Sequence, residues 1–154
     1  MKKKNVRILS FIAGFIMFIG LIFLFTIIAS TPAPTIEDCL KRAKLSSVYN
    51  YKVKDTTIIS AIGDYFESHE IIISRSDYRK LDSEIRAKPF FIEYDSLAIP
   101  KFAYGLDIDW SKTTESAFSQ KGKTFYDRLD PKLGEVIRIL LKDDSLLIVE
   151  YQNL

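Results

Sequence analysis

Two aspartates, Asp107 and Asp109, have the residue type and spacing that best suit a metal site in this chain. They begin the run DIDWSKTTESAF, which fits positions 1, 3, 5 and 9 of a calcium-binding loop with Asp107, Asp109, Ser111 and Glu115. The later positions do not fit. Lys112 stands where a glycine makes the sharp turn, and Phe118 replaces the final bidentate glutamate.

The same two aspartates allow a different interpretation if they lie on a strand. Alternate residues of a strand point to one face, so both carboxylates could bind a single divalent ion. Otherwise the aspartates face water while their apolar neighbours face the core, namely Leu106, Ile108 and Trp110. The strict alternation of polar and apolar residues favours aspartates that face water. A carboxylate- or metal-dependent hydrolase centred on Asp107 and Asp109 is therefore the alternative hypothesis.

Other residues that carry chemistry are few. His69 is the only histidine, which excludes zinc sites made of several histidines. It lies in a strand-like run beside Glu67 and Glu70, and we expect a surface or edge histidine there, although it could act as a lone general base. The single cysteine, Cys39, excludes a disulfide within the chain and fits a small apolar side chain on a helix face. No nucleophile elbow and no phosphate-binding glycine loop occurs, so we expect no cofactor.

Residues 8–30 form the strongest pattern in the chain, an uncharged and largely apolar stretch. At 1.5 Å per residue this helix would span about 33 Å, enough for a hydrocarbon core of about 30 Å. A cleaved signal peptide is the alternative, but its apolar region is usually about 7–15 residues long. Pro32 and Pro34 also stand directly after candidate cleavage positions, which argues against cleavage there. A retained signal-anchor is predicted, with Ile8, Phe15, Phe18, Leu21, Phe25 and Ala29 among its residues.

Charge around this stretch predicts its orientation. Four basic residues precede it and favour a cytoplasmic N-terminus: Lys2, Lys3, Lys4 and Arg7. Three more, Lys41, Arg42 and Lys44, follow the stretch, but long domains are translocated largely regardless of their charge. Without the first four, 18 of the 22 basic residues remain against 20 acidic ones, a net charge of −2. A domain with this balance is not expected to bind nucleic acid.

The chain is therefore predicted to comprise a basic cytoplasmic flank (1–7), a transmembrane anchor (8–30), a short linker (31–35) and one extracytoplasmic domain (36–154). In the domain, Thr35 is a good N-cap for a helix with an apolar stripe at Ile36, Cys39, Leu40 and Ala43. A second helix is predicted after an N-cap at Ser76, and it should end before Pro89. Its apolar stripe is Tyr78, Leu81 and Ile85.

Strand-like runs fill much of the remaining sequence. They cover Ser47–Val53, Thr56–Ile62, Tyr65–Ser74 and Phe90–Tyr94, with a hairpin turn at Gly63–Asp64. Residues 95–133 show the least regular pattern. The last 20 residues predict a hairpin in which Ile137, Ile139 and Leu141 share one face. Because helices and strands do not alternate at βαβ spacing, the predicted fold class is α+β, with a mainly antiparallel sheet and about two helices.

These patterns lead to one main functional hypothesis. A single-pass protein in the cell membrane would present a small domain that binds a protein or envelope partner, in an accessory or immunity-type role. The absence of a catalytic motif supports binding over catalysis, and all eight tyrosines and the only tryptophan lie in the domain. Its expected partners are the lipid bilayer and a second protein.

Overall fold

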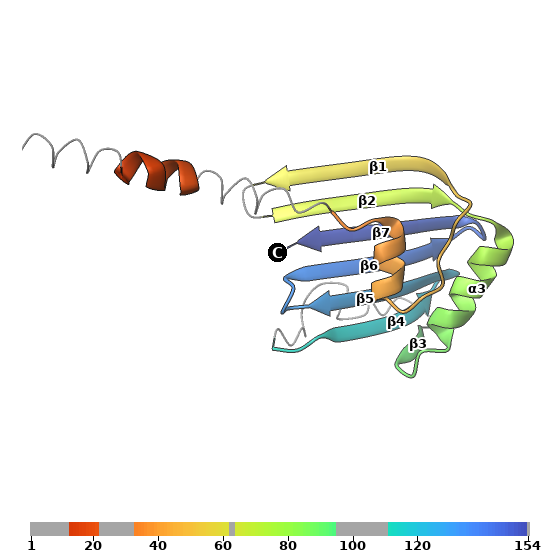
Figure 1. Ribbon diagram of the computed structural model, residues 1–154. Helices are drawn as coiled ribbons and strands as arrows, with labels where there is room; N and C mark the ends of the chain where they lie inside the picture. The colour runs from red at the N-terminus through yellow and green to blue at the C-terminus, as the bar shows by residue number, and fades with distance from the viewer. Residues whose placement is uncertain (1–12, 22–32, 62–63, 95–110, 154) are drawn as a thin grey trace, which may run out of the picture. The chain divides into compact units, whose positions relative to one another are not determined.

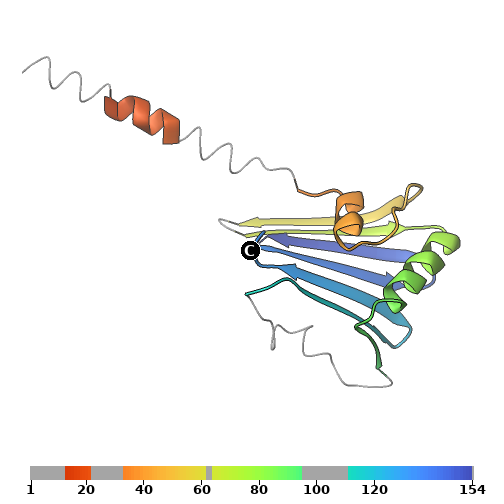
Figure 2. The same ribbon diagram turned by 60° about the horizontal axis from the view of Figure 1, so that its bottom comes forward.

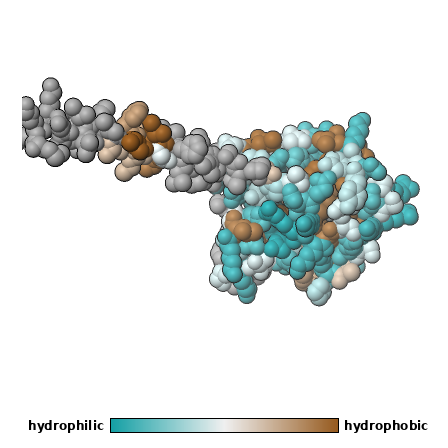
Figure 3. All heavy atoms as spheres, viewed as in Figure 1, coloured by the Kyte–Doolittle hydropathy of each residue, from teal (hydrophilic) through white to brown (hydrophobic). Residues whose placement is uncertain are grey.

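The computed structural model describes residues 13–21, 33–61, 64–94 and 111–153. The chain forms two compact units, Met1–Ala33 and Pro34–Leu154. In the first unit, residues 13–21 are helical and largely apolar (Figure 3). The side chains of Phe15, Phe18 and Leu21 are exposed. Within the described ranges, no helix combines the length and the apolar character that a membrane crossing requires. The other residues assigned to the anchor and its flank lie outside the described residues: Ile8, Phe25, Ala29, Lys2, Lys3, Lys4 and Arg7.

The second unit is built on a seven-stranded sheet with the order β1-β2-β7-β6-β5-β4-β3 (Figure 1). All neighbouring strands are antiparallel except β3 and β4, which are parallel. The predicted α+β class with a mainly antiparallel sheet is therefore confirmed. The strands are β1 (Lys52–Ala61), β2 (Asp64–Ile72), β3 (Phe91–Tyr94), β4 (Thr114–Gln120), β5 (Lys123–Asp130), β6 (Glu135–Lys142) and β7 (Leu146–Asn153).

Two helices, α2 (Ile36–Arg42) and α3 (Arg75–Arg86), cover one face of this sheet (Figures 1 and 2). The strand pattern explains why this face is covered, since β6 alternates between buried and half-buried residues. Ile137, Ile139 and Leu141 are fully buried, as predicted. They form one core cluster with Leu147 of β7 and with the buried stripes of both helices.

Helix α2 begins as the sequence predicts. The Thr35 hydroxyl accepts a hydrogen bond from the backbone N–H of Asp38 at 3.2 Å, and the Asp38 carboxylate accepts one from the backbone N–H of Thr35 at 3.1 Å. This capping box satisfies two N–H groups that have no partner within the helix. The buried side chains are Ile36, Cys39 and Leu40, so the predicted stripe is confirmed.

Helix α3 begins two residues earlier than predicted. Its N-cap is Ser74, whose hydroxyl accepts from the backbone N–H of Asp77 at 3.1 Å, and Ser76 already lies inside the helix. Both serines can cap a helix, because each has a hydroxyl that accepts from a backbone N–H. In the structure the N–H of Asp77, three residues after Ser74, is the donor. The predicted stripe of Tyr78, Leu81 and Ile85 is buried.

The prediction of a strand at Ser47–Val53 is wrong for most of that range. Strand β1 begins only at Lys52 and continues past the charged residues to Ala61. A register shift between Val53 and Asp55 lets the strand continue where its alternation breaks. Val48 is buried because it packs into the core from an irregular segment. The predicted β1–β2 hairpin is confirmed by the pairing of Ala61 with Asp64, and residues 62–63 lie outside the described residues.

Strands β4 and β5 form a hairpin inside the segment that the sequence marks as least regular. Lys121 and Gly122 make its turn with positive φ angles of 52° and 72°. The polar run hides this hairpin because several of its polar side chains lie in the sheet interior, including Ser119 and Thr124. A similar turn follows β6, where Asp143 and Asp144 have φ angles of 56° and 57°.

The environment of Cys39 gives a first prediction. Its side chain is 1% exposed, and burial raises the pKa of the thiol to about 12. Because the thiolate is the nucleophile, a maleimide at pH 8 should label Cys39 much more slowly in the folded protein than in protein unfolded by urea. Mass spectrometry of timed samples measures both rates. Equal rates in the two states would show that the thiol is accessible and that α2 does not pack as described.

Candidate functional site

One end of the sheet lies away from α3 (Figure 1), and ion-paired side chains lie on the helix-covered face there. Strand β5 ends and β6 begins at this end, so Asp130 and Glu135 lie opposite each other. The polar residues form two groups. The arginine cluster consists of Arg42, Glu115, Arg128, Asp130 and Glu135, and the His69 chain consists of Thr56, Tyr65, Glu67 and His69.

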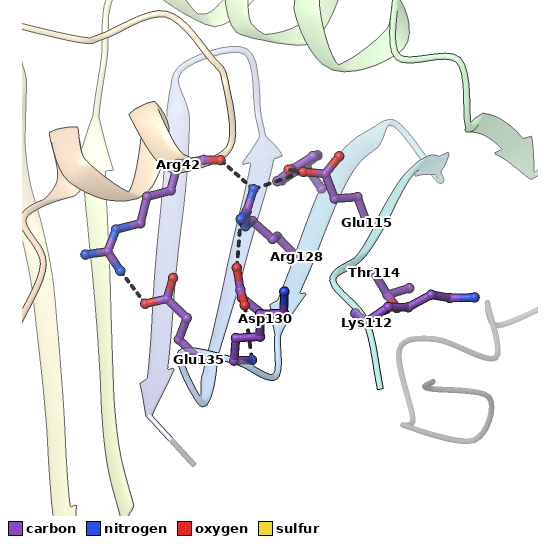
Figure 4. Close-up of polar contacts among 9 residues, drawn as sticks. Arg42, Lys112, Thr114, Glu115, Arg128, Asp130 and Glu135 are labelled. Carbon is purple, nitrogen blue, oxygen red and sulfur yellow. Dashed lines mark hydrogen bonds and ion pairs between the residues drawn. The ribbon is translucent and has the colours of Figure 1, made fainter. Parts of the chain in front are cut away.

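The arginine cluster joins the end of α2 to three strands (Figure 4). Arg42, the last residue of α2, forms an ion pair with Glu135 of β6. The guanidinium of Arg128 donates to the backbone carbonyl of Arg42 at 3.0 Å, to Glu115 at 3.2 Å and to Asp130 at 3.0 Å. Arg128 thus satisfies a carbonyl at the C-terminal end of α2, where helices leave such groups without partners.

Burial sets the electrostatics of the arginine cluster. The Glu135 side chain is 4% exposed, and burial raises its pKa although Arg42 opposes the shift. Burial also acts on Asp130, but hydrogen bonds from Arg128 and from the backbone outweigh it and lower the pKa of that carboxyl. Glu135 Oε1 and Arg128 Nε are buried without a hydrogen-bond partner. Such atoms are costly, so the cluster is not fully satisfied.

The arginine cluster is better suited to holding the fold than to catalysis. Each of its three carboxylates contacts a guanidinium, whose positive charge disfavours a cation at the same place. In the part of the chain that the structure describes, no group of three or more metal-binding side chains could hold an ion. We therefore interpret the cluster as the attachment of α2 to the sheet.

The His69 chain runs across β1 and β2. The imidazole lies 2.8 Å from Glu67 Oε1 through Nε2 and 3.1 Å from the Thr56 hydroxyl through Nδ1. The other Glu67 oxygen accepts from the Tyr65 hydroxyl at 2.6 Å, and this hydrogen bond is the main cause that raises the Tyr65 pKa to about 12. His69 lies on the second strand of the sheet with its side chain 21% exposed, so it is not at a sheet edge.

Hydroxyl, imidazole and carboxylate occur here in the order of a nucleophilic triad. Thr56, however, is exposed on β1, and a nucleophile of this kind normally works in a site that excludes water. Thr56 and His69 are also direct cross-strand partners. The His69 chain is therefore best interpreted as a tie that holds β1 in register on β2.

A third polar row lies on the sheet face away from the helices. Arg138 of β6 donates to Asp127 of β5 at 2.7 Å and lies 3.6 Å from Glu150 of β7. The Asp127 side chain is 1% exposed, and burial raises its pKa while Arg138 opposes the shift. These residues are opposite one another in the register, so the row links three strands.

Strand β1 exposes three large apolar side chains. It has ten residues and pairs, among the described strands, only with β2. Residues 52–60 are all exposed, with Val53 at 51%, Ile58 at 58% and Ile59 at 59%. Apolar patches are visible along the upper margin of the domain, where β1 lies (Figures 1 and 3). The opposite edge strand, β3, has only four residues.

The residues that the sequence singles out as a metal site are not brought together here. Asp107 and Asp109 lie outside the described residues, so the metal hypothesis stays a prediction. Two residues from the same run are in β4 and have other roles. Glu115 accepts from Arg128 and from the Tyr126 hydroxyl at 3.1 Å, and Phe118 is buried and stacks on Phe125 at 4.6 Å.

Sequence reasoning missed two features of this site. Arg42 enters it only as one of three basic residues that follow the apolar stretch, whereas Arg42 pairs with a glutamate 93 positions away. It also gives no sign that β1 is an edge, because strand order is not visible in the pattern. The only usable signal was the charge-free run of β-branched residues from Thr56 to Ile59.

No protein-family model, curated protein or solved structure matches the chain.

The Arg42–Glu135 pair gives a second prediction. Arg42→Ala should lower the free energy of unfolding by about 1–2 kcal/mol, because buried Glu135 loses its partner. Adding Glu135→Gln should restore part of this loss, since a neutral amide costs less to bury than a carboxylate. Urea unfolding followed by circular dichroism measures both values.

Lys142→Ala is the matched control, because Lys142 pairs with Asp143, whose side chain is 69% exposed. Its effect should stay within about 0.5 kcal/mol. If the double variant is no more stable than Arg42→Ala, the charge of Glu135 is not what Arg42 compensates.

Proposed function

We propose that the chain is a single-pass, membrane-anchored protein whose small α+β domain binds a protein partner along the edge of β1 that pairs with no other described strand. The length of this exposed edge is the observation that carries the proposal. Extended segments of a partner can add to such an edge as a further strand, using its unpaired backbone groups for affinity and its side chains for specificity.

Natural domains usually protect their sheet edges with short strands, charges, prolines or bulges. Strand β3 follows this rule through its length. Strand β1 follows it in one half only, where Lys52, Lys54 and Asp55 accompany the register shift. The other half, Thr56–Ala61, has no charge, no proline and no register shift. An unprotected half on an otherwise protected sheet supports a docking role for that half.

The His69 chain supports the same role. A strand that receives a partner must keep its register, because a slip of one residue would exchange its two faces. The contact of Thr56 with His69 lies at the boundary between the charged and uncharged halves of β1. The pair of Lys54 and Glu70, at 3.0 Å, ties the charged half to β2 as well. Both contacts hold β1 in place before any partner binds, which lowers the cost of ordering on binding.

The membrane location rests on residues 8–30 and on the basic flank before them. The helical stretch 13–21 exposes Phe15, Phe18 and Leu21 at 58%, 64% and 57%, which suits contact with lipid. An anchored domain is confined with any partner in the same membrane, which raises the effective concentration of both. We place the N-terminus in the cytoplasm and the domain outside the cell membrane, following the charge pattern.

A third prediction concerns this topology. The chain should stay in the membrane pellet after extraction at alkaline pH, and protease added to intact spheroplasts should degrade the domain. Immunoblotting with a C-terminal tag follows both steps. Release into the alkaline supernatant would contradict the anchor, and protection of the tag in intact spheroplasts would contradict the orientation.

A fourth prediction tests the docking edge. A photo-crosslinking amino acid in place of Ile59 should give adducts of higher mass in native membranes. The matched control is Ile92 on the short edge strand β3, which is 52% exposed compared with 59% for Ile59. The control should give no defined adduct. Absence of adducts at Ile59, or equal adducts at both sites, would contradict docking along β1.

A further inference from the structure

The charge pattern of β1 indicates what kind of strand fits its edge. The half from Thr56 to Ala61 is uncharged, and the other half contains Lys52, Lys54 and Asp55. A partner strand on the uncharged half should itself be uncharged and rich in β-branched residues, because such cross-strand pairs stabilise a sheet and buried charges do not. The Thr56–Ala61 segment has this composition itself.

We propose that the strand docked on β1 is β1 of a second copy of this chain, running antiparallel to the first. The inference rests on the proposed use of β1 as the docking edge and names its partner. Two copies related by a twofold axis present the same surface to each other, so the edge must be self-complementary. The uncharged half of β1 meets this condition.

The pleat of the strands restricts the register. Opposite residues of an antiparallel pair point to the same face, and a twofold axis through the sheet leaves each residue on its own face. Only registers in which one residue lies opposite its own copy satisfy both requirements. Both copies then carry their helices on the same side of one continuous sheet.

Among these registers, the one centred on Ile58 fits best. It places Ile58 opposite Ile58, Thr57 opposite Ile59, and Thr56 opposite Ser60, with all these side chains exposed in the single chain. The overlap extends from Asp55 to Ala61.

Neighbouring registers fit less well. A register centred on Thr57 places the Asp55 carboxylate opposite Ile59, and one centred on Ile59 shortens the overlap to residues 57–61. A register centred on Val53 brings Lys52 opposite Lys54, which repel each other. Charged residues therefore disfavour the registers centred on Thr57 and on Val53, and the shorter overlap disfavours the one centred on Ile59.

The size of this contact indicates where it forms. Seven opposed residue pairs, of which every second pair exchanges two backbone hydrogen bonds, give about six to eight bonds. A single strand pair is smaller than the surface that stable complexes usually bury, so association of the free domain should be weak. Two copies anchored in one membrane have a higher effective concentration, so the dimer should form there.

Disulfide crosslinking of the full chain in membranes tests the proposal. With Ile58→Cys, the two thiols would lie across one strand pair, where Cα atoms are about 4.5–5.5 Å apart, within disulfide reach. A mild copper–phenanthroline oxidation should then give a dimer of this chain on a non-reducing gel. Native Cys39 can stay in place, because it is buried.

Ile59→Cys is the matched control, since Ile59 and Ile58 are exposed to the same degree, 59% and 58%. In the proposed register the two copies of residue 59 are offset by two positions along the strand, which separates their Cα atoms by about 8 Å. This variant should give little dimer. The double variant Thr57→Cys/Ile59→Cys should crosslink again, because those two residues face each other across the axis.

The outcomes separate the two proposals. A dimer from Ile58→Cys and from the double variant, but not from Ile59→Cys, supports the register. A dimer from Ile59→Cys alone overturns it. If none of the variants crosslinks while the photo-crosslinker at Ile59 gives adducts of another mass, the partner is a different protein, so self-pairing fails and the proposed function stands. If no adduct forms either, both proposals fail.

Discussion

The pairing of β2 with β7 is the constraint on which the rest of the domain depends. Every other neighbouring pair in the sheet joins strands that follow each other in the chain, whereas β2 and β7 come from opposite ends of the domain. Their pairing extends from Tyr65 opposite Asn153 to Ile72 opposite Leu146. It brings Ile71 beside Leu147 in the core and makes β1 the edge of the sheet. Closing so long a loop costs entropy, which the buried core must offset.

The helix-covered face of the sheet buries different kinds of side chains at its two ends. Near α3 it buries apolar side chains, and near the far end it buries charges. There, Arg128 and Arg42 connect α2 to β4, β5 and β6, and the helix carbonyl takes part in the same network. Buried ion pairs add little net stability, but they penalise arrangements that would leave Glu135 without a partner. The network therefore serves mainly to fix where α2 ends on the sheet.

Local patterns predicted what local physics determines. The N-cap at Thr35, the stripe of Tyr78, Leu81 and Ile85, and the hairpin of β6 and β7 could all be predicted because each depends on residues close in sequence. The β4–β5 hairpin was missed, since Ser119 and Thr124 are polar yet buried. Most of the candidate site could not be predicted from the sequence. The edge position of β1 follows from strand order, and the pair of Arg42 and Glu135 follows from how α2 packs on the sheet. A sequence pattern contains neither.

Cys39 has a further consequence for the conditions in which the domain can exist. It is the only cysteine, so it has no partner within the chain. A surface thiol of this kind tends to form mixed disulfides with other molecules wherever the redox potential is high. Packing beneath α2 removes that risk, because a thiol that stays protonated neither exchanges nor oxidises readily. Burial of Cys39 beneath α2 therefore protects the fold from changes in the redox state of its surroundings.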